Sequence, residues 1–230
     1  MRADDPDVIE IEGPPPLKWP AEQVIAALRE VVTPERLRRI EEVVEGRTDD
    51  LAVVLDQIED PHNASAVLRS ADAFGVQNVH AIVGTSDFRA SRGVSKGTHR
   101  WIDVTRYESE EACARRLKAD GYAIYVATMD GETTPAQLQE QRRLAVVFGN
   151  EHRGVSPQMR SLADGTFSIP MRGFVESLNI SVAAAITLQT LAGDGRPRLD
   201  PARRQKLLAR FLMNSVKNAD EIIAQSRGND

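Results

Sequence analysis

From residue 51 onward, short β-branched runs alternate with stretches that have the apolar spacing of amphipathic helices. Residues 52–55 and 145–148 are apolar without alternation, which is typical of strands that are covered on both faces. This order of strands and helices predicts an α/β domain with a mostly parallel sheet flanked by helices. The expected strands are 51–58, 78–84, 101–107, 122–129, 144–149 and 167–171, and the expected helices are 63–74, 109–120, 135–141, 157–163 and 180–191.

The two ends of the chain differ from this central region. The first twenty residues combine acids with prolines, which predicts disorder. Further on, Pro34 follows Thr33, a good N-cap, and Gly46 ends a second helical stretch. An amphipathic helix is expected from Asp200 to about Ala224. The predicted organisation is a disordered tail over 1–20, a helical arm over 21–50, the α/β domain over 51–193 and a basic C-terminal helix over 194–230.

Charge is unevenly distributed along the chain. The net charge of -5 argues, as an average, against a nucleic-acid partner. Residues 1–12 alone contribute -4, however, whereas residues 196–217 carry +6 and residues 85–101 carry +3. Phosphate contacts need local cationic segments rather than a positive total. The two basic segments therefore keep an RNA partner open, with solvated helix faces as the simpler alternative.

Several classes of protein are disfavoured. No window approaches 18 continuous apolar residues, and the acidic N-terminus does not have the pattern of a signal peptide. Cys113 is the only cysteine, so we expect no intrachain disulfide, no cysteine metal cluster and a reducing, cytoplasmic compartment. The four histidines are scattered, and no metal site is expected. Residues 149–154 lack both the P-loop lysine and the spacing of a dinucleotide loop.

Three expected strands end in polar, glycine-rich segments that lead into helices. These segments are 60–63, followed by a helix that carries Arg69, then 148–154, and then 169–181. Sites in open α/β sheets lie at the carboxyl ends of the strands, so the three segments are candidates for one site.

Each segment also has a purely structural interpretation. Asn63 and Asn179 could simply cap helices, and Glu151 could be a carboxylate at a helix start. Gly149 could serve only a turn. Arg69 could be a surface arginine, since helical phase places it about 120° from Asn63. It is the combination that favours a functional site.

Taken in order, the three segments resemble the motifs of the SpoU ribose 2′-O-methyltransferases of the SPOUT superfamily. The resemblance spans about residues 51–192, and the short N-terminal helices, the Lys-Gly-Thr-His-Arg-Trp stretch at 96–101 and the basic C-terminal helix are similar to TrmH-type tRNA enzymes. The matching residues are Asn63, Arg69 and Ser-Ala-Asp-Ala-Phe-Gly at 70–75, then Phe-Gly-Asn-Glu at 148–151 with Gly154, then Ile-Pro-Met at 169–171 and Ser-Leu-Asn-Ile-Ser-Val-Ala at 177–183.

The resemblance implies a SPOUT fold with a deep C-terminal trefoil knot, a homodimer and S-adenosylmethionine as the methyl donor. Because the sulfonium supplies an electrophilic methyl group, no metal is needed. The resemblance assigns catalysis to Arg69, Asn63, Glu151, Ser177 and Asn179, and cofactor binding to Thr128, Gly149, Ile169, Met171 and Leu178. The expected RNA contacts are Arg92, Lys96, Arg100, Arg203, Arg204 and Arg210.

The implied function is 2′-O-methylation of a ribose in tRNA, with guanosine 18 of the D loop as the expected target. Ribosomal RNA or another tRNA nucleoside is the alternative substrate. A noncatalytic RNA-binding module and a small-molecule binding protein are the alternatives from other classes. Neither a membrane nor DNA is an expected partner.

Overall fold

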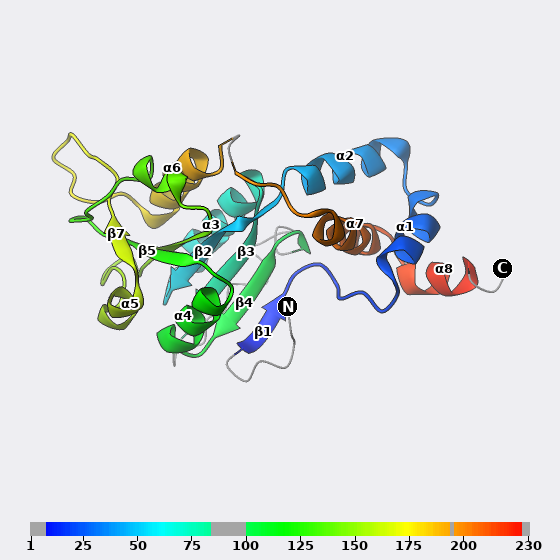
Figure 1. Cartoon of the computed structure of the whole chain (residues 1–230), viewed down its shortest axis with the longest axis horizontal. Coiled ribbons are helices and arrows are strands. Elements are labelled where there is room, and N and C mark those ends of the chain that lie inside the picture. The colour runs from blue at the N-terminus through cyan, green and yellow to red at the C-terminus, as the bar shows by residue number, and fades with distance from the viewer. Residues whose placement is uncertain (1–7, 84–99, 194–195, 227–230) are drawn as a thin grey trace. The chain divides into compact units, whose positions relative to one another are not determined.

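The described strands form one sheet, in the order β1-β4-β3-β2-β6-β5-β7 (Figure 1). The computed structural model describes residues 8–83, 100–193 and 196–226. All of these strand pairs are parallel except β1 with β4, which is antiparallel. The strands are β1 (Val8–Glu12), β2 (Thr48–Asp56), β3 (Val76–Ile82), β4 (Asp103–Tyr107), β5 (Ala123–Ala127), β6 (Leu144–Phe148) and β7 (Gly165–Phe167).

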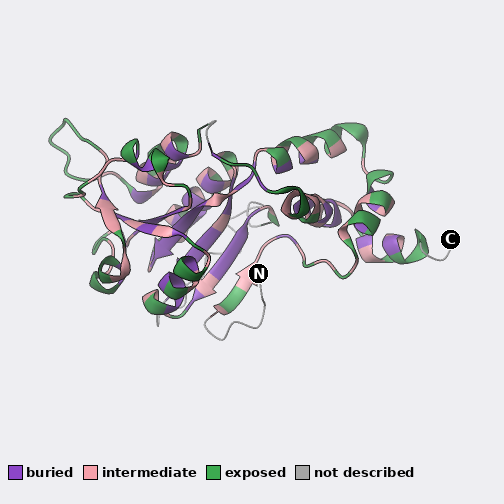
Figure 2. Ribbon diagram, viewed as in Figure 1, coloured by how far each residue is buried: buried purple, intermediate pink, exposed green. Residues whose placement is uncertain are grey.

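Helices cover both faces of this sheet, as the unbroken apolar runs predicted. In β2, Leu51, Val53 and Leu55 share a buried cluster with residues of α3 (Pro61–Ala73) and α6 (Ile180–Leu191). The alternate residues Ala52 and Val54 share a second cluster with α4 (Glu110–Ala119) and with Met159 of α5 (Pro157–Leu162). Successive side chains of a strand point to opposite faces, so the central strands are apolar throughout. Figure 2 shows these strands as buried along most of their length.

The mostly parallel α/β prediction is confirmed, with differences at some element ends. The helix expected over 180–191 has those bounds, and the helix expected over 135–141 is a short 3-10 helix, η2 (Gln137–Glu140). The strand expected over 167–171 is wrong: β7 ends at Phe167, and Pro170 has no N–H to continue a ladder. None of the described helices is both long and apolar enough to cross a membrane.

The prediction that residues 1–20 are disordered is wrong for the part that the structure describes. Val8–Glu12 forms β1, which adds an antiparallel edge to the sheet beside β4. Arg106 of β4 makes ion pairs with Glu10 at 2.8 Å and with Glu12 at 2.5 Å. Two of the acidic residues that suggested disorder, Glu10 and Glu12, are therefore paired with a strand arginine.

The predicted helical arm and the C-terminal segment form one helical unit, residues 13–47 with 198–230, separate from the sheet unit. Its buried side chains include Val24, Leu28, Leu207, Phe211 and Leu212. The single helix expected from Asp200 to about Ala224 is wrong, because the chain leaves helical geometry after Ser215 and Asn218 has a φ of 56°. The four helices are α1 (Ala21–Arg29), α2 (Pro34–Glu45), α7 (Pro201–Ser215) and α8 (Ala219–Ser226).

Arg196 belongs to the basic C-terminal segment by sequence but is directed inward. It is only 8% exposed, and burial lowers the pKa of its guanidinium. Its charge is therefore not available to a phosphate backbone. Its Nη1 and Nε donate to four main-chain carbonyls, those of Asp50 (3.2 Å), Gln141 (2.8 Å), Arg142 (3.1 Å) and Leu191 (3.0 Å).

We expect Arg196→Ala to lower the free energy of unfolding by about 3 kcal/mol, because four buried or partly buried carbonyls lose their donor. Arg198→Ala is the matched control: Arg198 is exposed and donates from Nη1 to the Gly46 carbonyl. The control should cost less than about 1 kcal/mol. Urea unfolding of both variants measures the difference, and equal losses would contradict a clamp at Arg196.

Candidate active site

The carboxyl ends of β2, β6 and β5 lie along one edge of the sheet, because these neighbouring strands are parallel. The polar segments 60–63 and 148–154 follow β2 and β6, and the third segment, 169–181, follows β7, which pairs in parallel with β5. The chain leaves β2 toward α3, leaves β6 into a turn at Gly149, and leaves β5 at Thr128. The fold thus brings segments that are far apart in sequence to a single edge.

Two hydrogen bonds connect three predicted catalytic residues. The Asn63 Nδ2 donates to the Glu151 Oε1 at 2.9 Å, and the Asn179 Nδ2 donates to the Asn63 Oδ1 at 3.0 Å. Asn63 and Glu151 are half-buried and Asn179 is exposed, so the hydrogen-bonded network extends from partly buried side chains to an exposed one. One residue from each sequence segment takes part.

The structure shows which of these side chains cap helices. Asp60, not Asn63, caps α3, by accepting from the His62 N–H at 2.8 Å. Asn179 does cap α6, because its Oδ1 accepts from the Ser181 N–H, while its Nδ2 remains for Asn63. Glu151 lies in a turn before α5 rather than at a helix start. The local roles therefore explain only part of the polar groups.

A tight turn after β6 holds Glu151 in place. The Asn150 and Gly154 main chains exchange two hydrogen bonds, at 2.9 and 2.8 Å. Gly154 has a φ of 69°, a conformation that favours glycine. At Gly149 an added Cβ would lie 2.1 Å from the Gly154 carbonyl carbon, so a side chain has no room there. Both glycines of the segment have a steric reason.

Arg69 and Ser177 are not in contact with this network. Arg69 lies on α3 six residues beyond Asn63, is exposed, and has no ion pair or hydrogen bond within the described ranges. Ser177 is also exposed, in the irregular segment before α6. Both side chains are therefore accessible to a substrate.

The predicted cofactor residues lie at the ends of β5, β6 and β7 and in the segment before α6. The Thr128 N–H donates to the Phe167 carbonyl at 2.9 Å, while the buried Thr128 Oγ1 has no hydrogen-bond partner in the part of the chain that the structure describes. Ile169 and Leu178 are half-buried, and Met171 is 37% exposed. A buried hydroxyl without a partner in the described residues, strand-end main chain and partly exposed apolar side chains are the kinds of groups that an adenosyl site needs.

Residues 50–189 match the model of the SpoU rRNA Methylase family, which covers more than half of the chain. The chain belongs to the SpoU methylase family. Its methyltransferase activity and its use of S-adenosylmethionine follow from this membership. The predicted resemblance is therefore confirmed.

Similar proteins cover most of this chain. It is 40% identical over 188 residues to a tRNA (guanosine(18)-2'-O)-methyltransferase of Thermus thermophilus, covering 78% of this chain and 97% of that protein. The crystal structure of the A. aeolicus TrmH/SpoU tRNA modifying enzyme aligns with a TM-score of 0.70 and 30% identity, covering 80% and 98% of the two chains. The SpoU methyltransferase AviRb from Streptomyces viridochromogenes, solved in complex with AdoMet, aligns with a TM-score of 0.57 and 26% identity, covering 66% and 60%.

The predicted RNA contacts of this SpoU methylase have mixed outcomes. Arg92 and Lys96 lie outside the described residues, and Arg100 is exposed. The Arg204 Nη1 pairs with Glu45 of α2 at 2.7 Å, and Arg210 donates to the carbonyls of Pro14 and Pro15. Arg203 is half-buried. The α7 arginines thus also hold the helical unit together.

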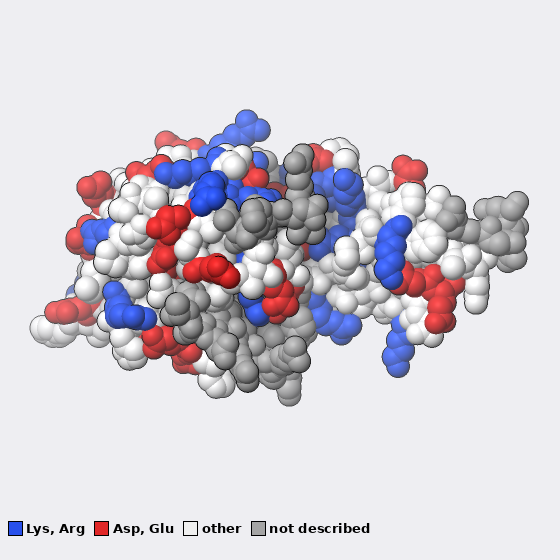
Figure 3. All heavy atoms as spheres, turned by 90° about the horizontal axis from the view of Figure 1, so that it is seen from below, with Lys and Arg blue, Asp and Glu red and all other residues white. Residues whose placement is uncertain are grey.

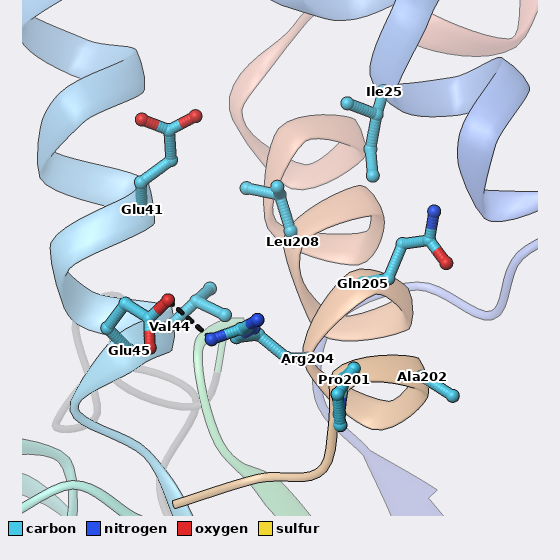
Figure 4. Close-up of a pocket in the computed structure, with 9 residues that line it drawn as sticks. All are labelled: Ile25, Glu41, Val44, Glu45, Pro201, Ala202, Arg204, Gln205 and Leu208. Atoms are coloured by element: carbon cyan, nitrogen blue, oxygen red, sulfur yellow. Dashed lines mark hydrogen bonds and ion pairs between the residues drawn. The ribbon is translucent and has the colours of Figure 1, made fainter.

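Two further features of the described structure are the charge on one face and a groove in the helical unit. On the face drawn in Figure 3, basic and acidic side chains are interspersed. A groove in the helical unit lies between α2 and α7 and includes the ion pair of Arg204 with Glu45 (Figure 4). It is lined by Ile25, Glu41, Val44, Glu45, Pro201, Ala202, Arg204, Gln205 and Leu208, all of the helical unit.

The sequence interpretation missed the groups that anchor the Glu151 turn. Asn150 donates from Nδ2 to the Gln57 carbonyl at 3.0 Å, and the Ser156 N–H donates to the Asp56 Oδ2 at 2.7 Å. The available signal was a carboxylate, Asp56, at the end of an otherwise apolar run. Its partner lies 100 residues away in the chain and is visible only in the fold.

Proposed function

We propose that this SpoU methylase transfers the methyl group of S-adenosylmethionine to the ribose 2′-hydroxyl of guanosine 18 in tRNA. The relative from Thermus thermophilus carries that activity in its name and is 40% identical. The observation that carries the proposal is the hydrogen-bonded series of Asn179, Asn63 and Glu151, which unites the three sequence motifs at the carboxyl edge of the sheet.

S-adenosylmethionine supplies the electrophilic methyl group when it is bound. The residues of the chain must then align a hydroxyl and help to remove its proton. Arg69 is exposed and unpaired within the described ranges, so its guanidinium is available to grip a substrate phosphate in a bidentate manner. In this position Arg69 would assist deprotonation of the hydroxyl, directly or through that phosphate. Asn63, Glu151, Ser177 and Asn179 would shape the ribose pocket.

For the cofactor, we assign the adenosyl site to Thr128, Gly149, Ile169, Met171 and Leu178. The unpaired hydroxyl of Thr128 is the polar group that a ligand would satisfy. The missing side chain at Gly149 allows main chain to pack at the end of β6. In this assignment Ile169 and Leu178 contribute apolar surface.

We also propose the trefoil knot, the homodimer and a cytoplasmic location. The connection from β5 to β6 is hydrogen-bonded to the start of the 168–179 segment and to the helix that follows it. The Ser168 N–H donates to the Thr133 carbonyl, and the Gln139 Nε2 donates to the Thr190 carbonyl of α6. This arrangement is compatible with threading of that segment.

For the dimer, Val182 and Ile186 lie one turn apart on the exposed side of α6, an apolar surface that a second copy would cover.

RNA binding by the α7 arginines has its own test. Replacing Arg203, Arg204 and Arg210 with glutamine should weaken tRNA binding and reduce the slope of log K against log salt by roughly one for each lost phosphate contact. Because Arg204 and Arg210 also hold the helical unit, circular dichroism must show an unchanged fold. Filter binding at several salt concentrations measures the slope. A slope equal to that of the wild type would assign these arginines to packing alone.

Ribosomal RNA is the second candidate substrate, because the matching family is described as rRNA methylases. Mapping ribose methylation in total RNA from a deletion strain and from the wild type separates the two. Loss of the methyl group at guanosine 18 of tRNA is expected. A methyl group missing from ribosomal RNA, with tRNA unchanged, would overturn the proposal.

A further inference from the structure

Asp56 is a buried carboxylate at the carboxyl end of β2. Its exposed fraction is 1%, and burial raises the pKa of the carboxyl. Oδ2 accepts from the Ser156 N–H at 2.7 Å, while Oδ1 is buried without a hydrogen-bond partner in the described residues. Keeping a charged group in such a place is costly. An apolar side chain at position 56 would pack in the β2 core at a lower cost. Core packing therefore does not explain the carboxylate, whereas its hydrogen bond to Ser156 does.

The neighbouring residue, Gln57, fixes the other end of the same loop. Gln57 has a φ of 54°, a backbone conformation that residues other than glycine rarely adopt. In this conformation its N–H donates to the Ile82 carbonyl at 3.1 Å, and its carbonyl accepts from the Asn150 Nδ2 at 3.0 Å. The Gln57 Nε2 donates to Glu110 at 2.7 Å, which holds the side chain as well. The strained residue is thus held on several sides.

Together these contacts attach both ends of the 150–156 loop to two consecutive residues. Asn150 binds the main chain of Gln57, and Ser156 binds the side chain of Asp56. The loop carries Glu151, whose partner Asn63 is on α3, which begins at Pro61. Both members of the Asn63–Glu151 pair are therefore positioned by the segment that runs from the end of β2 to α3.

We propose that Asp56 is a positioning residue for methyl transfer: it anchors the 150–156 loop so that Glu151 meets Asn63. The inference rests on the proposed function, in which Glu151 shapes the ribose pocket. What the loop needs from residue 56 is an acceptor for the Ser156 N–H, and asparagine can provide one. The role is therefore distinct from a role of the negative charge.

The first test compares Asp56→Ala with Asp56→Asn in the full-length protein. Asp56→Ala removes the acceptor, and we expect kcat to fall about 100-fold, as for a misplaced reacting group, with a smaller change in KM for tRNA. Asp56→Asn retains an acceptor and should keep most of the wild-type kcat. Equal losses in both variants, or full kcat in Asp56→Ala, would overturn the proposal.

A double-mutant cycle with Glu151→Ala separates positioning from general stability. If Asp56 acts through Glu151, the double variant Asp56→Ala/Glu151→Ala should be no slower than Glu151→Ala alone. Additive losses would overturn the proposal. Ser109→Ala, which removes the N-cap of α4, is the matched stability control: it should lower Tm by about 3 °C with kcat unchanged.

Two further outcomes are distinguishable. If Glu151→Ala itself has wild-type kcat, the role of Glu151 in the proposed function fails; if it is impaired while Asp56→Ala is not, only the present inference fails. Should Asp56→Ala not fold, Asn150→Ala releases the other end of the loop and is measured in its place. The same non-additivity with Glu151→Ala is then expected, and additivity would contradict the anchoring role.

Discussion

Replacing Arg69 with alanine is expected to lower kcat for methyl transfer by about 10³-fold, within the range for loss of a group that moves a proton. The Kd for S-adenosylmethionine should not change, because Arg69 is not among the residues assigned to the adenosyl site. The side chain is exposed on α3, with no partner in the described residues, so its loss disturbs no packing. Single-turnover kinetics and calorimetry measure the two quantities separately.

Two variants sharpen this prediction. Arg69→Lys keeps a positive charge but loses the planar fork, and it should be nearly as inactive if bidentate phosphate recognition matters. Arg115→Ala removes another exposed helix arginine, on α4 over the opposite face of the sheet, and should leave kcat unchanged. Substantial turnover in Arg69→Ala would contradict the catalytic role.

Replacing Gly149 with alanine is expected to have the largest effect on the structure of the site. The added Cβ would lie 2.1 Å from both the Gly154 carbonyl carbon and the Val155 nitrogen, so main chain would have to move. We expect the free energy of unfolding to fall by at least about 3 kcal/mol, the upper range for overpacking. The turn that carries Glu151 would shift with it, and both cofactor binding and methyl transfer should be lost.

Gly173→Ala is the matched control for this substitution. Gly173 is exposed, and the nearest atom to an added Cβ there is the Val175 nitrogen at 4.0 Å. Its free energy of unfolding should stay within about 0.5 kcal/mol of the wild type. Urea unfolding compares the two variants. A Gly149→Ala protein as stable as Gly173→Ala would show that the close approach at Gly149 does not constrain the fold.

The central sheet could be predicted from the sequence because burial on two faces leaves a direct mark. Runs such as 52–55 and 145–148 are apolar at every position, and they form the middle of β2 and β6. The helix over 180–191 was predicted with its bounds, since Asn179 provides its N-cap. The approximate site followed as well, because parallel strands place their carboxyl ends at one edge.

The parts that the sequence did not reveal depend on contacts between distant residues. The acidic 8–12 segment forms a strand by pairing with β4, where Arg106 makes ion pairs with Glu10 and Glu12, about 95 residues away. The basic charge of Arg196 is buried by carbonyls of other segments, which no local pattern shows. In the sequence, Asp56 is likewise only the last residue of a predicted strand, and its hydrogen bond with Ser156 is visible only in the fold.

The most direct test of the account is to locate the methyl group that the purified protein adds to RNA. An unmodified tRNA transcript is incubated with S-adenosylmethionine and mapped by nuclease digestion and mass spectrometry, beside a matched transcript with deoxyguanosine at position 18. We expect one methyl group on the ribose of guanosine 18 and none in the deoxy transcript. Equal methylation of both transcripts, or a methyl group on a base, would contradict it.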